Sequence, residues 1–387
     1  MKKIYWLHTH LLFPTGGTRY IFEVVRQLRK HYEIEIYVEQ SSSEWEQKFD
    51  EIGVKVHKIC PLTSTSPVYW IFFPIFLLSN FLALKKAIRK SDIVISTMFP
   101  MQFLASLLSS RTLYFCFEPF AFFYDKDLIR FYSILKRALL NLLAAVYSLL
   151  DQLGTKRSSI LLTINPSVGK WINRIYGRTP EGFSYLGVDV DYFKPSQQNT
   201  KKESISIFHS TDFTPLKGTR YLCEALSLVL KKHRNLTVTI SETVENPKEK
   251  AELAQLLEKN QCIDQVQFVG HLSYQDLPKY YQSSDIYVFS GDPASTGATA
   301  ASLSVLEASA AGLAIVRSVG NDDEVVPGLT GVMIDPRNTS ELSHAIESLV
   351  SNPQRMRQMG KAGREHVLKT YTWDEVAKEF YHWIERL

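Results

Sequence analysis

The sequence predicts an α/β protein made of two doubly wound domains in tandem, and three observations lead to this prediction. Short apolar runs of strand length alternate with amphipathic segments of helical spacing, which is typical of parallel βαβ units. The 387 residues exceed what one hydrophobic core usually serves. A polar stretch at residues 196–203 has the composition of a linker and separates two such series.

The first series begins with a predicted strand at residues 4–8. A loop at residues 14–18 follows, and Ile21, Val24, Val25 and Leu28 then recur at the spacing of a helix. Further strands are predicted at residues 34–38, 54–59 and 92–96.

The second series begins with a strand at residues 205–208. A loop at residues 216–219 opens a helix whose apolar face includes Leu222, Ala225 and Val229. Further strands are predicted at residues 236–240, 266–269, 286–289 and 313–316. In such folds ligands bind beyond the carboxyl ends of the strands, so two facing domains would form a cleft.

Two apolar segments of the first half have alternative interpretations. Residues 67–84 are nearly all apolar, and Lys85 and Lys86 follow them. Spanning a membrane takes about 20 apolar residues, and this run is interrupted by Pro74 and Asn80. A buried helix is the favoured interpretation, and an interfacial helix with a basic flank is the functional alternative. Residues 134–150 could lie beside it.

Charge is distributed unevenly along the chain, whose net charge is +4. Residues 1–190 hold 23 Lys and Arg against 15 Asp and Glu, whereas residues 191–387 hold 21 against 25. A basic first half favours an anionic surface or substrate on that side, and ordinary solvated charge explains it equally well. Four widely spaced cysteines and the lack of a signal peptide at Met1 indicate a cytoplasmic protein with reduced thiols.

Residues 302–312 form an apolar helix that carries one acid, Glu307, and ends at Gly312. Burying that acid is costly without a polar partner. A ribose hydroxyl would be such a partner, and the N–H groups at the start of the helix would suit a neighbouring phosphate. A buried Glu that caps local backbone is the alternative, and these residues alone leave both open.

Two loops have the composition of anion-binding turns. Gly16-Gly17-Thr18 lies between the first strand and the first helix, where glycines let a ligand approach the backbone. Lys217 occupies the equivalent loop of the second series, where a lysine can neutralise a diphosphate. Each signal is weak alone, since a tight turn or a solvated lysine explains it. His8 and His10 fall on one side of the first strand, as core or rim residues. The Asp pairs at residues 125–127 and 189–191 are interpreted as structural, so no metal site is predicted.

Together these features resemble glycosyltransferase family 4, a family of retaining sugar transferases with the GT-B fold, in which two Rossmann-like domains face a cleft. The resemblance covers nearly the whole chain. The segments that carry it are residues 16–18, 160–165, 176–177, 186–195, 215–218, 268–272, 280–286, 306–312 and 371–373. It implies an acceptor-side domain at residues 1–195, a nucleotide-sugar-binding domain at 196–370, and a closing helix at 371–387 that crosses back to the first domain.

The resemblance also implies roles for particular residues. Glu307 would contact the ribose, and Lys217 would lie beside the diphosphate with the N–H groups near Leu303 and Ser304. Lys217 and Glu307 are therefore the expected catalytic residues. The other expected substrate-binding residues are Gly16, Gly17, Thr18, Glu118, Gly270, His271, Ser302, Leu303 and Ser304. No metal or other cofactor is implied, since the nucleotide-diphosphate sugar is the donor substrate.

Three positions depart from the family pattern. Thr299 stands where a first glutamate is usual, although some members carry a Ser-x-Ser run like that at residues 302–304. Asp212 stands where an arginine is often found five residues before Lys217, and an anion near a diphosphate should weaken binding. Phe117 replaces a common histidine before Glu118.

The sequence therefore predicts a retaining glycosyltransferase that moves a sugar from a nucleotide-diphosphate sugar to a hydroxyl of a glycan or lipid-linked acceptor. A catalytically degenerate relative that acts as a binding or partner subunit is the alternative, and a sugar-nucleotide epimerase is a third candidate that shares the fold. We expect a cytoplasmic protein, at the inner face of the membrane if the basic, apolar first domain makes peripheral contact. No nucleic-acid partner is expected.

Overall fold

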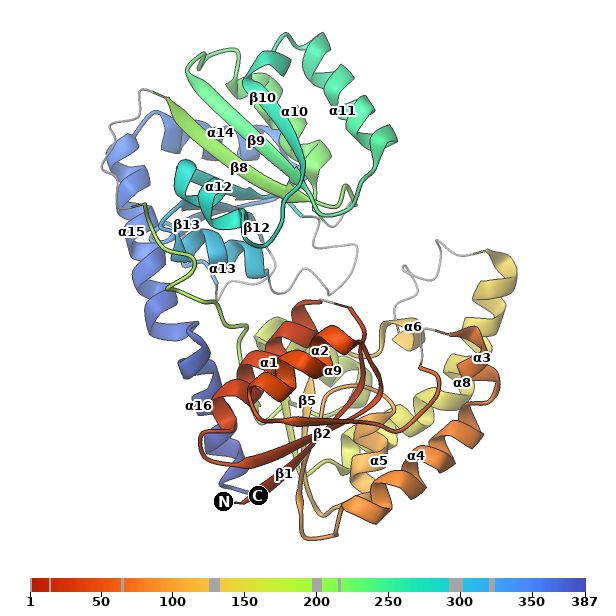
Figure 1. Ribbon diagram of the computed structural model, residues 1–387. Coiled ribbons are helices and arrows are strands. Elements are labelled where there is room, and N and C mark those ends of the chain that lie inside the picture. Colours follow the sequence, from red (N-terminus) through yellow and green to blue (C-terminus); the bar gives the residue numbers. More distant parts are fainter. Residues whose placement is uncertain are drawn as a thin grey trace. The chain divides into compact units, whose positions relative to one another are not determined.

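Figure 1 shows the computed structural model, in which residues 2–13, 15–63, 66–124, 133–196, 204–214, 217–291, 302–319 and 324–387 are described. The chain forms two compact units, Met1–Leu186 with Trp373–Leu387 and Gly187–Thr372. Each unit has one parallel sheet covered by helices, which confirms the prediction of two Rossmann-like domains.

The first unit is organised around a parallel sheet with strand order β3-β2-β1-β4-β5-β6-β7 within the described residues. Its strands are β1 (Lys3–Leu11), β2 (Glu33–Ser41), β3 (Lys55–Lys58), β4 (Ile93–Ser96), β5 (Arg111–Cys116), β6 (Ile160–Thr163) and β7 (Gly182–Phe183). The four predicted strands of this half form with small shifts at their ends, whereas β5, β6 and β7 were not predicted.

Helices cover this sheet and close its core. They are α1 (Gly16–Leu28), α2 (Ser43–Glu51), α3 (Pro67–Ile71), α4 (Phe73–Ala87), α5 (Met101–Leu108), α6 (Ala121–Tyr124), α8 (Ile134–Arg157), α9 (Pro166–Tyr176) and α16 (Trp373–Ile384). The last helix packs on α1, and its Phe380 ring stacks on Trp6 of β1 with centroids 5.7 Å apart. The C-terminal segment is therefore part of the first unit's core.

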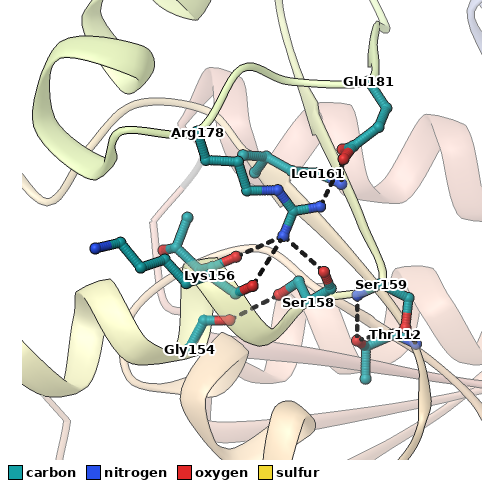
Figure 2. A network of polar contacts seen from close by, with 9 residues as sticks. Thr112, Gly154, Lys156, Ser158, Ser159, Leu161, Arg178 and Glu181 are labelled. Carbon is teal, nitrogen blue, oxygen red and sulfur yellow. Dashed lines mark hydrogen bonds and ion pairs between the residues drawn. The ribbon is translucent and has the colours of Figure 1, made fainter.

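The C-terminal end of α8 is fixed by Arg178, as Figure 2 shows. One guanidinium nitrogen donates to the carbonyl oxygens of Thr155 at 2.8 Å and Ser158 at 2.6 Å, which are among the acceptors that a helix end leaves unpaired. The other nitrogen contacts Glu181, whose second oxygen accepts from Leu161 N–H of β6 at 2.6 Å. Arg178 thereby joins the end of α8 to the sheet.

The rest of α8, together with α3 and α4, exposes apolar side chains. Leu142, Val146 and Leu149 of α8 are each more than half exposed, and so are Ile71 and Ile75. In α4, Phe73, Asn80 and Leu84 are the buried residues. The favoured prediction of a buried helix at residues 67–84 is therefore wrong for its outer face. The described part of the chain includes one helical segment, Lys136–Arg157, that could cross a bilayer by length and composition alone.

The second unit has strand order β10-β9-β8-β11-β12-β13 in the part of the chain described. Its strands are β8 (Ile205–Thr211), β9 (Leu236–Glu242), β10 (Val266–His271), β11 (Ile286–Phe289), β12 (Ala314–Ser318) and β13 (Gly331–Ile334). Its helices are α10 (Thr219–Val229), α11 (Pro247–Lys259), the 3-10 turn η1 (Ile263–Gln265), α12 (Leu277–Ser283), α13 (Leu303–Ala310), α14 (Thr339–Val350) and α15 (Pro353–Thr370).

Strand order reverses in each sheet at one point. In the first unit β1 lies between β2 and β4, and in the second β8 lies between β9 and β11. At such a switch point the loops leave in opposite directions and open a crevice at the carboxyl ends of the strands, where ligands of doubly wound folds bind. The loops after β1, β8 and β11 are therefore the positions to examine.

The compact units differ from the expected domain ranges at both boundaries. Residues 187–195 belong to the second unit, because Val188 bridges to Thr372 and the Phe193 ring packs on Tyr281. The chain returns to the first unit at Trp373 instead of residue 371, since Tyr371 is the residue whose carbonyl accepts from Val188 N–H.

Candidate functional site

The loop that leaves β8 is held tightly against the end of β11. Gly218 has φ +64°, and a Cβ atom at this position would lie 1.7 Å from the carbonyl oxygen of Ser290. The Ser290 hydroxyl in turn donates to the carbonyl of Gly218 at 2.9 Å. A glycine is required here both by the positive φ and by the close backbone approach. The two loops of the switch point are thereby joined.

Lys217 lies in this loop, half-buried, directly before the start of α10. Its ammonium nitrogen is 5.7 Å from the centroid of the Phe289 ring, at the last residue of β11. The guanidinium of Arg317 in β12 approaches the same ring at 5.8 Å. Two cationic side chains therefore approach one aromatic ring at the carboxyl edge of the sheet, the half-buried Lys217 and the fully buried Arg317.

A buried polar network beneath the loop fixes its shape. Nδ1 of His209 lies 2.9 Å from the carbonyl of Val288, which can accept and cannot donate. Burial lowers the pKa of His209 to about 4, so the ring is neutral with its proton on Nδ1. Nε2 then accepts from the Thr219 hydroxyl at 2.9 Å. The network holds the first residue of α10, and sequence analysis did not find it.

Helix α13 follows β11 and carries the acid singled out in the sequence. Glu307 is buried, and the hydroxyl of Tyr281 in α12 donates to its Oε2 at 3.1 Å. Glu307 therefore has a polar partner within the protein, Tyr281, whereas the sequence analysis suggested a ribose hydroxyl as its partner. A carboxylate accepts several hydrogen bonds, so this contact and a ligand contact are compatible.

The start of α13 is fixed by a buried ion pair. Ser302 N–H donates to Oε1 of Glu324 at 2.8 Å, and the other oxygen of Glu324 contacts Arg317. The Ser302 hydroxyl contacts the Ser304 hydroxyl at 2.9 Å and does not cap the first turn. Leu303 and Ser304 are thus the first residues of a helix that directs its amino end toward the carboxyl edge of the sheet. Arg317 and Glu324 were missed by sequence analysis, although an arginine inside an apolar strand was a usable signal.

Gly270 and His271 lie farther from the switch point. They end β10, which is separated from β8 by β9, so the strands are about 10 Å apart. His271 is exposed, and space around Gly270 is open. Their expected role in binding a nucleotide stays a prediction.

The corresponding loop of the first unit starts α1 at Gly16. The Thr15 hydroxyl accepts from Thr18 N–H at 3.2 Å and caps the helix. A Cβ atom on Gly17 would lie 3.8 Å from the Phe117 ring, so the ring that replaces the expected histidine lies beside this turn. Glu118 follows the half-buried Phe117 and is exposed. The structure therefore brings the Gly-Gly turn close to the segment after β5.

Two further positions from the sequence analysis can be placed. Asp212 accepts from the N–H and the hydroxyl of Thr214 at 2.9 and 2.6 Å, so it shapes the turn before Lys217. Asp189 likewise accepts from Asp191 N–H at 3.2 Å. Thr299 and the acidic pair at residues 125–127 lie outside the described residues. No group of three or more potential metal-ligating side chains occurs in the described ranges.

Residues 191–366 match the model of the family Glycosyl transferases group 1. These residues are therefore similar to a glycosyltransferase group 1 domain. The chain is 26% identical over 240 residues to a GDP-mannose-dependent monoacylated phosphatidylinositol monomannoside mannosyltransferase of Corynebacterium glutamicum, covering 58% of this chain and 61% of that protein. A related mannosyltransferase of Mycobacterium tuberculosis is 27% identical, over 49% of this chain and 52% of the relative. The matches thus span about half to three-fifths of these relatives.

Solved structures of glycosyltransferases share the fold. Anabaena Alr3699/HepE, solved in complex with UDP, has a TM-score of 0.75 at 14% identity and covers 100% of both chains. Sucrose-phosphate synthase from Thermosynechococcus elongatus has a TM-score of 0.73 at 14% identity, covering 100% of this chain and 99% of the other. At this identity the likeness establishes the fold, and the GT-B assignment rests on it.

Proposed function

We propose that this protein is a retaining glycosyltransferase that moves a sugar from a nucleotide-diphosphate sugar to a hydroxyl group of a glycan or lipid-linked acceptor. The observation that carries the proposal is the placement of Lys217 and the start of α13 on the two loops of the second unit's switch point, inside the matched group 1 domain. A diphosphate there would meet a cation and helix N–H groups together.

Each residue of this site has a distinct part in the proposed reaction. Lys217 and the N–H groups of Leu303 and Ser304 would stabilise the negative charge that develops on the departing nucleoside diphosphate, which is the main electrostatic demand of the reaction. Glu307 would hold the ribose, with Tyr281 orienting its carboxylate. We propose that no metal ion takes part, and transfer that persists in excess EDTA would support this.

The acceptor is proposed to bind to the first unit, with Glu118 and the Gly16–Thr18 turn as candidate contacts. The exposed apolar side chains of α3, α4 and α8, with the basic residues 85–90 beside them, support peripheral contact with an anionic membrane surface. Two relatives are mannosyltransferases whose acceptors are phosphatidylinositol mannosides, which fits a lipid-linked acceptor at the inner face of the cell membrane.

Donor binding is the direct test. With GDP-mannose or UDP-glucose at a hundred times its dissociation constant, the cognate donor should stabilise the protein by about 2.7 kcal/mol in a thermal shift assay. Glu307→Gln should weaken that donor by about 10- to 100-fold, the worth of a hydrogen bond to a charged group. Glu258→Gln, on the exposed face of α11, is the matched control.

A second assay, which measures release of nucleoside diphosphate, separates the candidate functions. Release of nucleoside diphosphate in the presence of acceptor supports the enzyme. Tight donor binding without release under any acceptor favours the catalytically degenerate subunit, for which Thr299, Asp212 and Phe117 are the motivating substitutions. Equal donor affinity of Glu307→Gln and Glu258→Gln would overturn the assignment of Glu307.

A further inference from the structure

The first unit contains an apolar cavity of about 370 Å³, lined in part by residues at the end of β1 and in the segment after β5. Its size falls within the range of small-molecule pockets. Its lining residues are His10, Trp70, Met98, Phe120, Phe122, Phe123, Lys136, Leu139, Leu140 and Leu143. Eight of these ten side chains are aromatic or aliphatic, and two can be cationic.

One wall of the cavity is a single face of α8. Lys136, Leu139, Leu140 and Leu143 follow the spacing i, i+3, i+4, i+7, which places them in a row along the helix. At a rise of 1.5 Å per residue this row is about 10 Å long. Lys136 stands at its N-terminal end, and its side chain is exposed. The cavity is therefore elongated, with a positive charge at one end.

The opposite wall is a cluster of rings. Trp70 lies 5.9 Å from Phe120 and 6.1 Å from Phe123, measured between ring centroids, and Phe120 and Phe123 are 4.8 Å apart. Trp70 also packs near Tyr147, one turn beyond Leu143 on α8. The rings therefore line the end of the cavity farthest from Lys136. Such a surface favours hydrocarbon, since its rings are apolar apart from the indole N–H of Trp70.

His10 adds one polar group to the lining. Its Nδ1 atom is buried and is not paired with another residue in the part of the chain described, although the ring interacts with the backbone of His10 itself. A buried polar nitrogen of this kind costs free energy until a partner meets it. Burial lowers the pKa of the ring, so near neutral pH it is neutral and can contact a hydroxyl or a carboxylate oxygen.

We propose that this cavity binds a single hydrocarbon chain of an anionic amphiphile, with the chain between α8 and the rings around Trp70 and the head group beside Lys136 and His10. Its identification with the chain of the lipid-linked acceptor rests on the proposed function. The exposed stripe of Leu142, Val146 and Leu149 lies on a neighbouring face of α8 and would contact the membrane from which such a chain enters.

The test uses the full chain and dodecanoate brominated at the end of its chain, kept below its micelle concentration. Bromine quenches nearby tryptophans, so binding should quench fluorescence in the native protein, and Trp70→Phe should remove that quenching while calorimetry still detects binding. Leu140→Gln and Leu143→Gln should weaken binding at least about tenfold, the worth of a buried leucine. Leu142→Gln and Leu149→Gln, outside the cavity, should leave the affinity unchanged. Circular dichroism checks that each variant is folded.

Other results would overturn the proposal. If Leu142→Gln and Leu143→Gln weaken dodecanoate binding equally, the dodecanoate adsorbs to the exposed stripe and does not enter the cavity. Quenching by vesicles of chain-brominated phosphatidylglycerol, without quenching by the monomeric dodecanoate, would assign this face to the bilayer surface and leave no chain in the cavity. Because the readout is binding in the first unit, a failure here is distinct from a failure of donor binding at Lys217 and Glu307.

Discussion

A buried acid, Asp151 of α8, should make the stability of the first unit depend on pH. Its carboxylate is fully buried and accepts hydrogen bonds from Gln102, Tyr124 and Tyr176, the two hydroxyls each at 2.8 Å. Burial raises the pKa of Asp151 from 3.8 to about 6, and the three donors oppose the shift without cancelling it. In the unfolded chain the same group ionises at about 3.9.

The size of the effect follows from these two values. Between about pH 4 and pH 6 the folded state binds more protons than the unfolded state, so the free energy of unfolding falls as the pH rises. A difference of about two pKa units corresponds to about 3 kcal/mol. The stabilisation from the protonated acid is thus fully present below about pH 4 and is lost as the pH rises through 6.

The Asp151→Asn variant isolates this contribution because asparagine keeps the shape and cannot ionise. All six tryptophans, at positions 6, 45, 70, 171, 373 and 383, belong to the first unit, so their fluorescence during urea unfolding reports on that unit alone. As the pH rises from 4 to 7, the free energy of unfolding of Asp151→Asn should increase by about 3 kcal/mol relative to that of the native protein. Asp50→Asn, at an exposed position, should show no such gain. If the difference in unfolding free energy between Asp151→Asn and the native protein does not change with pH, the raised pKa of Asp151 is refuted.

Other predictions concern backbone fit, a helix end and the donor site. Gly218→Ala should lower the free energy of unfolding, followed by circular dichroism, by more than about 2 kcal/mol, because both the positive φ and the Ser290 carbonyl oppose a Cβ atom. Gly328→Ala should lower it by only about 1–2 kcal/mol, because its φ is also positive but its surroundings are open. Arg178→Ala should lower the stability of the first unit by about 1–3 kcal/mol, because it leaves carbonyls at the end of α8 unpaired, while exposed Arg174→Ala should stay within about 0.5 kcal/mol. Lys217→Gln should weaken donor binding about tenfold or more in calorimetry without changing the unfolding midpoint, and equal affinity would contradict its role.

Much of the fold could be predicted because buried parallel strands have a local signature. Runs such as residues 286–289 and 313–316 are apolar throughout and follow helical segments, so their type and order were readable. The strands β5, β6, β7 and β13 were not predicted, and β6 was missed although its residues Ile160–Thr163 are mostly apolar and buried. β7 has two residues, too few to form a pattern, and β5 begins at Arg111 and continues into an aromatic run that suits a helix equally well.

The candidate site was partly predictable for a related reason. Lys217 and Glu307 stand next to elements whose order the sequence reveals, so their approach to one edge of the sheet could be expected. His209 and Glu324 could not be found, because their partners Val288 and Ser302 lie on segments that become neighbours only through strand pairing and loop packing. The exposure of α4 also depends on tertiary packing, since composition alone gives no reason to leave its outer face uncovered.

The charges around Phe289 show how a helix end can be held in place without losing its attraction for an anion. Glu324 fixes Ser302 at the start of α13, and a lone carboxylate there would repel a phosphate. Arg317 pairs with Glu324 and neutralises it, and both are buried, so neither is screened by solvent. Lys217, whose ammonium nitrogen approaches the Phe289 ring at the end of β11, is the cation of this edge that lies outside that pair. Asp212 does not cancel it directly, because both contacts to its Oδ1 come from Thr214. Among these groups Lys217 is therefore the cation assigned to the diphosphate, and Asp212, in the turn before it, is the charge that opposes it.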